Sequence, residues 1–217
     1  MIVNGSTHQH DRSDDTSRIN FTYLALGDSY TIGQDVPAQD NYPNQTISLL
    51  KTHNIYGQVK IIATTGWTTQ NLNSAIVNDT TLSAYDIVTL LIGVNNQYHG
   101  QTADDYKPEF ENLLQKSIAF AKNKSSHVIV LSIPDWSVTP FAQGRDRTAI
   151  SKEIDAFNAV NKTISEKYKV NYLDVTPWTR EAANDNSLLA SDGLHPSATE
   201  YARWATKLEE MISVILK

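Results

Sequence analysis

Five short apolar runs alternate along this chain with longer segments in which apolar residues recur at helical spacing. The runs, read as strands, cover residues 21–26, 59–63, 86–92, 127–133 and 170–175. The run at 86–92 is apolar at nearly every position, as expected of a strand covered on both faces. Helices are predicted over 43–53, about 69–77, a segment ending near 123, 148–168 and a last stretch that follows Ser197. The alternation predicts a three-layer α/β/α fold with a five-stranded parallel sheet.

Two segments have less definite patterns. Pro108 leaves two starts open for the helix that ends near residue 123: Thr102 caps a short first turn, or the main helix begins at Pro108. Residues 177–192 are irregular, with at most one helical turn, and Ser197 to Glu200 then form a capping box for the last helix. Neither an internal repeat nor a second core is evident, so residues 20–217 are predicted to form one domain.

Residues 1–19 are polar and mixed in charge, and they are predicted to form a flexible arm. His8 and His10 lie in this arm, where solvated histidines are expected rather than metal ligands. The start of the sequence lacks the apolar core of a signal peptide, which favours a cytoplasmic protein as written. A secreted or periplasmic mature form stays open. No apolar run approaches the roughly 18 residues of a membrane span.

Composition narrows the possible chemistry. The formal net charge is −6 and no basic stripe is present, so nucleic acid is not an expected partner. The chain has no cysteine, which excludes disulfides, thiolate catalysis and zinc sites with cysteine ligands. The sequence does not determine the oligomeric state, and a monomer is the favoured expectation.

Polar or flexible residues follow the first three predicted strands. Ser29 comes after the first strand in the turn Gly27–Asp28–Ser29, Gly66 after the second, and Asn95 after the third. The carboxyl ends of parallel strands line the crevice where α/β proteins bind ligands. Gly-Asp-Ser is also a common turn sequence, so Ser29 is a candidate nucleophile only if the chain supplies a base and an acid.

The segment before the last helix supplies both. Asp192 precedes His195 by three residues, so its carboxylate can accept a hydrogen bond from Nδ1 and leave Nε2 facing a serine. His99, beyond Asn95, is the one serious rival as base, but no carboxylate comes shortly before it.

Taken together, these motifs resemble the SGNH hydrolases, also called the GDSL esterase/lipase family. Gly27–Asp28–Ser29 resembles the family's first block, with Tyr30 where the family name has leucine. Gly66 resembles the second block, Gly93–Asn96 the third and Asp192–His195 the fourth, over about residues 21–217. The third block usually ends in aspartate, and Asn96 stands there instead. The resemblance implies a flavodoxin-like fold.

The resemblance also implies roles. Ser29 would be the nucleophile, His195 the general base and acid, and Asp192 the orienting carboxylate. The oxyanion hole would consist of the Ser29 and Gly66 N–H groups and the Asn95 side-chain amide. The implied activity is hydrolysis of a small-molecule acyl ester through an acyl-enzyme, and this chemistry needs neither a metal nor an organic cofactor.

Aromatic residues on the predicted loops are candidates for lining the substrate crevice: Trp67, Tyr98, Trp136, Phe141 and Trp178. No lid-like apolar helix is evident, which favours short acyl esters, with acetyl groups on carbohydrate as one class. A thioesterase or lysophospholipase is the alternative within hydrolases. A flavodoxin-like phosphate-binding module or a non-catalytic glycan-binding relative is the alternative outside them, although no phosphate-binding glycine motif follows the first strand.

Overall fold

The structure, a computed structural model, describes residues 18–217. Five strands form one sheet in the order β2-β1-β3-β4-β5, and every neighbouring pair is parallel. The strands are β1 (Ile19–Gly27), β2 (Ile55–Ala63), β3 (Ile87–Leu91), β4 (Val128–Leu131) and β5 (Asn171–Leu173). The predicted five-stranded parallel sheet is thus confirmed.

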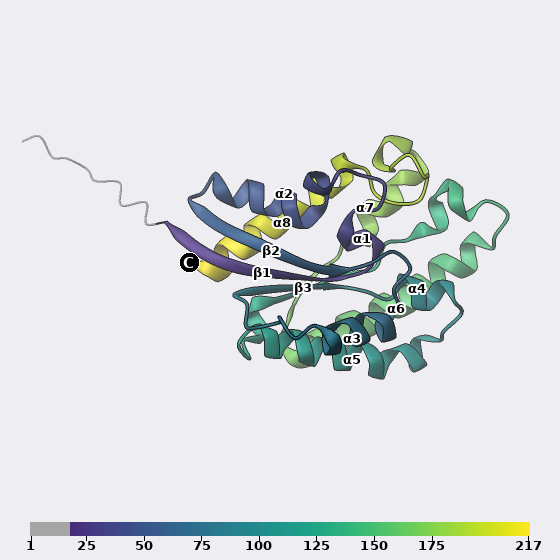
Figure 1. Ribbon diagram of the computed structural model, residues 1–217. Coiled ribbons are helices and arrows are strands. Elements are labelled where there is room, and N and C mark those ends of the chain that lie inside the picture. The colour runs from purple at the N-terminus through teal and green to yellow at the C-terminus, as the bar shows by residue number, and fades with distance from the viewer. Residues whose placement is uncertain (1–17) are drawn as a thin grey trace, which may run out of the picture.

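Helices cover both faces of the sheet (Figure 1). On one face, α2 (Tyr42–Lys51) packs against α8 (Ala198–Leu216). On the other, α5 (Ala103–Phe120) packs against both α3 (Thr69–Asn78) and α6 (Arg147–Tyr168). The remaining α-helices are short and follow strands β1, β3 and β5: α1 (Ser29–Ile32), α4 (Val94–Tyr98) and α7 (Thr176–Thr179).

Several single turns of 3-10 helix fill the connections. They are η1 (Ala38–Asp40), η2 (Ser125–His127), η3 (Trp136–Val138), η4 (Pro140–Ala142), η5 (Arg180–Ala183) and η6 (Asn186–Leu188). The segment after β5 that was expected to be irregular contains the short helix α7 and two of these turns, η5 and η6. Their lengths are below what periodicity can detect.

The strand order reverses beside β1. The chain moves outward from β1 to β2 and then returns to place β3 on the other side of β1. Gly27, the last residue of β1, lies opposite Ala63 of β2 and Leu91 of β3, so the three strands end at one level. A reversal of this kind opens a crevice at the carboxyl ends of the strands, which is where α/β sheets bind ligands.

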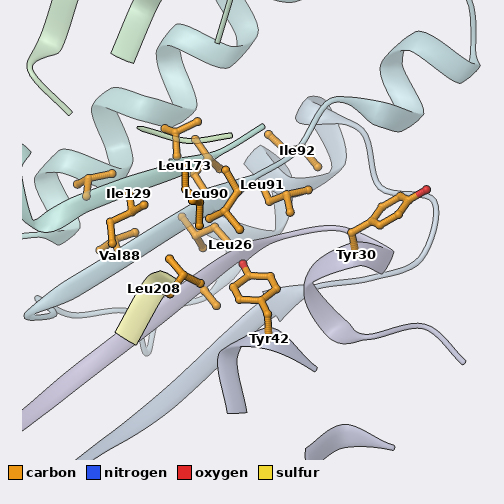
Figure 2. Packing of buried hydrophobic residues seen from close by; sticks show 14 of the residues in the cluster. Leu26, Tyr30, Tyr42, Val88, Leu90, Leu91, Ile92, Ile129, Leu173 and Leu208 are labelled. Carbon is orange, nitrogen blue, oxygen red and sulfur yellow. The ribbon is translucent and has the colours of Figure 1, made fainter. Parts of the chain in front are cut away.

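Apolar side chains from the strands and both helical layers form one continuous core (Figure 2). Leu26, Leu90 and Ile129 contribute from three neighbouring strands and are fully buried. Tyr42 of α2 and Leu208 of α8 lie against the same sheet. The Tyr42 hydroxyl is hydrogen-bonded to Thr89 Oγ1 at 3.3 Å, so this buried polar group has a partner.

The start of β2 differs most from the prediction, and α5 follows one of the two starts that the sequence left open. β2 begins at Ile55 rather than Val59, because its first residues pair with β1 at the edge of the sheet. Ile55 is buried but the next three residues are partly or fully exposed, so they form no apolar run. α5 starts at Ala103 behind a Thr102 cap and continues through Pro108. Pro108 has no N–H, so the Asp104 carbonyl lacks its usual helical hydrogen bond. Both residues are exposed, so water can bond that carbonyl instead.

Residues 1–17, which include His8 and His10 and most of the predicted arm, lie outside the described part of the chain. None of the helices within residues 18–217 is long and apolar enough to cross a membrane.

Candidate active site

Ser29 is the first residue of α1, directly after the turn that ends β1. Asp28 caps this helix by accepting a hydrogen bond from the Tyr30 N–H at 3.0 Å. Gly27 is required by close packing, since a Cβ there would lie 2.1 Å from Thr31 Oγ1 and 2.5 Å from the Leu91 carbonyl. The sequence Gly-Asp-Ser therefore brings the serine tightly around the end of the strand.

Ser29, His195 and Asp192 form a continuous hydrogen-bonded row. Ser29 Oγ lies 2.9 Å from His195 Nε2, and His195 Nδ1 lies 2.6 Å from Asp192 Oδ2. The second carboxylate oxygen of Asp192 accepts the Leu194 and His195 N–H groups at 2.9 and 3.0 Å. Ser29 is 3% exposed and His195 6% exposed, so the reacting pair is largely shielded from water.

The Asp192 carboxylate is held in its charged form. Partial burial acts to raise its pKa, but the hydrogen bonds from the His195 ring and from two backbone N–H groups outweigh it, and the pKa of Asp192 lies below its ordinary value. An ionised Asp192 can orient the imidazole and stabilise the imidazolium that forms when His195 takes a proton.

Tyr30 packs beside the imidazole. Its ring centroid lies 4.9 Å from that of His195, with the two planes tilted by 52°. Tyr30 is buried, and it stands where the motif that names the resembling family has leucine. The larger ring fills the space behind His195 and restricts its rotation while Asp192 fixes one edge.

Gly66 and Asn95 line the same pocket as Ser29 and His195. Gly66 has φ of +81°, in the region that favours glycine, and its N–H makes no hydrogen bond to other described residues. Asn95 Nδ2 donates to the Trp67 carbonyl at 3.0 Å, which fixes the amide and leaves its second N–H available. The first residue of a helix also has an unpaired N–H, and Ser29 occupies that position.

Asn96 faces away from the pocket and is buried. Its Oδ1 accepts the Thr69 N–H at the start of α3, and its Nδ2 donates to Thr69 Oγ1 and Gln101 Oε1, each at 2.6 Å. Thr69 Oγ1 in turn donates to Glu109, which also lies 3.5 Å from Asn96 Nδ2. An aspartate here would place a second carboxylate beside Glu109, so asparagine suits this network.

Three of the five aromatic candidates line the pocket, namely Tyr98, Trp136 and Phe141. The rings form a cluster with centroids 5.6–6.1 Å apart. The other two, Trp67 and Trp178, are not among the lining residues. The Trp67 ring packs partly buried against the core, and Trp178 packs there with Arg203 over its outer face.

His99 also lies outside the pocket lining. It ends α4, and its ring is placed edge-on to Tyr98. The structure thus brings His195, not His99, to Ser29.

The pocket has further walls that the sequence reasoning did not include: Tyr30, Thr65, Val94 and Leu194. Each is a neighbour in the chain of Ser29, Gly66, Asn95 or His195. Adjacency to the motif residues was therefore the signal that could have identified them. The pocket encloses about 180 Å³, and its lining is mostly apolar.

Comparisons with known proteins point to one family. The model described as the GDSL-like Lipase/Acylhydrolase family matches residues 25–203. No curated protein sequence matches the chain.

Solved structures share the fold at low sequence identity. The crystal structure of TesA is 17% identical, with a TM-score of 0.69, and the match covers 90% of this chain and 99% of that one. A lipase/acylhydrolase from Enterococcus faecalis is 18% identical, with a TM-score of 0.71, over 90% and 97% of the two chains. Axe2, an acetylxylan esterase from Geobacillus stearothermophilus, is 20% identical, with a TM-score of 0.70, over 90% and 95%.

Proposed function

Because the chain belongs to the GDSL-like lipase/acylhydrolase family, and is therefore a hydrolase by family, we propose that it is a serine esterase that cleaves short-chain acyl esters. The observation that carries the proposal is the row from Ser29 through His195 to Asp192, which opens into a small apolar pocket. Acetyl groups on carbohydrate are one substrate class that suits this site, and an acetylxylan esterase shares the fold.

In the proposed reaction, Ser29 Oγ attacks the ester carbonyl while His195 Nε2 takes its proton. The N–H groups of Ser29 and Gly66 and the Asn95 amide receive the oxyanion of the tetrahedral intermediate. His195 then gives its proton to the leaving alcohol, which departs and leaves an acyl-Ser29. Water repeats the sequence with His195 as base, and the carboxylic acid leaves with the acyl group.

The size of the pocket supports a short acyl group. A cavity of about 180 Å³ is smaller than the roughly 300–1,000 Å³ of pockets that enclose drug-sized ligands. It has room for an acetyl or similar group beside Ser29, whereas a long acyl chain would extend into solvent. Tyr98 and Phe141 are about two-fifths exposed at the mouth, where a sugar or aryl ring of the alcohol can stack.

A fluorophosphonate probe and a series of p-nitrophenyl esters test the proposal. Wild-type protein should carry the label on Ser29, and kcat/KM should be highest for acetate and fall with chain length. Ser29→Ala should lose the label and lower kcat by on the order of a millionfold, as loss of a triad nucleophile does. Ser74→Ala, on the exposed face of α3, is the matched control and should label and turn over like wild type.

Two other results would overturn the proposal. A wild-type protein that neither reacts with the probe nor turns over any ester would be a binding module. Higher kcat/KM for acyl thioesters or lysophospholipids than for every oxygen ester of a short acid would favour the other hydrolase classes.

A further inference from the structure

Arg145 lies over the aromatic mouth of the pocket. Its guanidinium carbon is 4.9 Å from the ring centroid of Tyr98, 5.4 Å from that of Trp136 and 5.5 Å from that of Phe141. One Nη2 hydrogen is donated to the Tyr98 hydroxyl at 3.0 Å. All three rings line the pocket that contains Ser29, so Arg145 contacts the wall of that pocket without being one of its lining residues.

No carboxylate neutralises Arg145 within residues 18–217, since none lies within 4.0 Å of its guanidinium. The side chain of its neighbour Asp146 does not pair with Arg145. Instead it caps α6 by accepting the Ala149 N–H at 3.0 Å. By contrast, Arg180 and Arg203 each contact two carboxylates. Arg145 therefore keeps a full positive charge and most of its five N–H donors.

Several hydrogen bonds within the loop around Arg145 do not involve its guanidinium. The Arg145 N–H donates to the Ala142 carbonyl at 3.1 Å, and Arg147 Nη2 donates to the Thr139 carbonyl at 3.1 Å. Asp146 fixes the start of α6. The stacking of Arg145 on the rings is therefore additional to the backbone and capping contacts of this loop.

A stacked and unpaired arginine is well suited to bind an anion. The aromatic faces orient the planar guanidinium, so less rotamer freedom is lost when it forms two hydrogen bonds with a carboxylate or phosphate. A second cation is disfavoured at this position, because the positive charge of Arg145 would repel it. Short acyl groups fit beside Ser29, so the anion belongs to the alcohol part of the ester, which extends to the mouth.

We propose that Arg145, stacked on Tyr98, Trp136 and Phe141, makes this site selective for acyl esters whose alcohol part carries an oxyanion. The oxyanion is a carboxylate, as on an acidic sugar, or a phosphate. This inference rests on the proposed esterase function and adds the substrate class to it. Arg145 is a specificity residue here and takes no part in bond breaking.

Three acetyl esters that differ only at the remote end of the alcohol test the inference: 4-acetoxybenzoate, its neutral methyl ester and 4-acetoxyphenyl phosphate. The measured quantity is the ratio of kcat/KM for each anion to that for the neutral ester. Dividing the wild-type ratio by the ratio in a variant cancels the different intrinsic reactivities of the three esters.

Arg145→Gln should lower the anion-to-neutral ratio about tenfold, as expected for loss of one charge-assisted contact. Arg145→Lys keeps the charge without the planar fork and should give an intermediate ratio. Lys152→Gln removes the same charge from an exposed position early in α6 and should keep the wild-type ratio. Whichever anion gives the larger change identifies carboxylate or phosphate as the preferred group.

The inference would be overturned if the anion-to-neutral ratio of kcat/KM were the same in wild type and Arg145→Gln. It would also be overturned if Lys152→Gln lowered that ratio as much as Arg145→Gln does, because the cause would then be the net charge of the protein. In both cases, turnover of the neutral ester and labelling of Ser29 would leave the esterase proposal standing. Absence of turnover and of labelling would overturn both.

Discussion

Asn95 and Asn96 are adjacent in α4, but their side chains lie in different surroundings. Asn95 has its amide at the pocket and donates to the Trp67 carbonyl, whereas Asn96 is buried among groups of α3 and α5. The two side chains are chemically identical, so any difference between their variants reflects placement alone.

Asn95→Ala should lower kcat about 10²- to 10³-fold with little change in KM, because an oxyanion donor acts mainly in the transition state. Asn96→Ala should instead lower the free energy of unfolding by about 1–3 kcal/mol, since it leaves the buried Thr69 N–H without its acceptor. Steady-state kinetics with p-nitrophenyl acetate and urea unfolding of both variants separate the two roles. The reverse pattern would place the oxyanion donor at Asn96.

The nearby Glu109 carboxylate allows a test of why asparagine, rather than aspartate, is suited to position 96. Asn96→Asp should be less stable than wild type at pH 7, since two carboxylates would then share one buried network. Adding Glu109→Gln to Asn96→Asp should recover part of the loss.

Residue identities and their order were the most predictable part of the site. Ser29, Asp192 and His195 were recognisable because each belongs to a short motif whose chemistry depends on neighbours in the chain. The contact between Asn96 and Glu109 joins helices that are separate in sequence, and the packing of Tyr30 on His195 spans most of the chain. No local pattern encodes such contacts. The same reason explains why Trp67 and Trp178 were not separable from the three rings that line the pocket.

At the scale of elements, the site depends on two loops that meet at Asp35. This residue follows α1, and its Oδ2 accepts the Asp192 N–H at 2.9 Å and the Ser191 hydroxyl. The loop after α1, which begins with Ser29, is thus joined to the loop that carries Asp192 and His195. Asp35 has φ of +66°, a conformation that aspartate and asparagine tolerate better than most residues.

Asp35→Ala should lower kcat about tenfold with KM nearly unchanged, because displacement of Asp192 disturbs the imidazole rather than substrate binding. Asp35→Asn keeps both the backbone conformation and an acceptor oxygen, so it should recover most of the activity. Asp40→Ala, in η1 of the same connection, is the control and should behave like wild type. If Asp35→Asn were as slow as Asp35→Ala, the hydrogen bonds to Ser191 and Asp192 would not be the cause.

For the molecule as a whole, one buried carboxyl couples folding to pH. Asp28 is fully buried, one of its oxygens accepts the Tyr30 N–H, and the other has no partner among the described residues. Burial raises the pKa of Asp28 to about 7, and the hydrogen bond from Tyr30 only partly opposes this. The folded protein therefore binds a proton that the unfolded chain releases near pH 4.

A raised pKa of Asp28 makes the folded protein less stable as the pH rises. The contribution of Asp28 to stability is complete below about pH 4 and is lost as pH rises towards 7, because the folded state then gives up a proton that it binds more tightly than the unfolded state. Asp28→Asn is neutral at every pH, so its free energy of unfolding relative to wild type should rise by roughly 2–4 kcal/mol between pH 5 and pH 8. Urea unfolding at both pH values measures this. Asp104→Asn, on the exposed first turn of α5, is the control, and a parallel pH dependence in wild type and Asp28→Asn would contradict the argument.

The overall architecture was predictable because apolar runs and helical periodicity repeat many times over the chain, so single errors did not change the topology. Element ends were less predictable. The first residues of β2 form no apolar run and are placed in a strand by pairing with β1. α5 passes through Pro108 where the affected carbonyl belongs to an exposed residue. Both depend on surroundings that a local sequence window does not contain.

The separation of 166 positions between Ser29 and His195 in the sequence has a kinetic consequence. Contacts between distant parts of a chain are the slowest to form, since a large loop must close before they contribute. Strands β1, β2 and β3 need only residues 19–91, but Ser29 lacks its hydrogen bond to His195 until the segment ahead of α8 has closed over the end of β1. A partly folded chain can thus hold most of its sheet and remain chemically inert, so recovery of catalysis during refolding reports the final long-range closure rather than the formation of secondary structure.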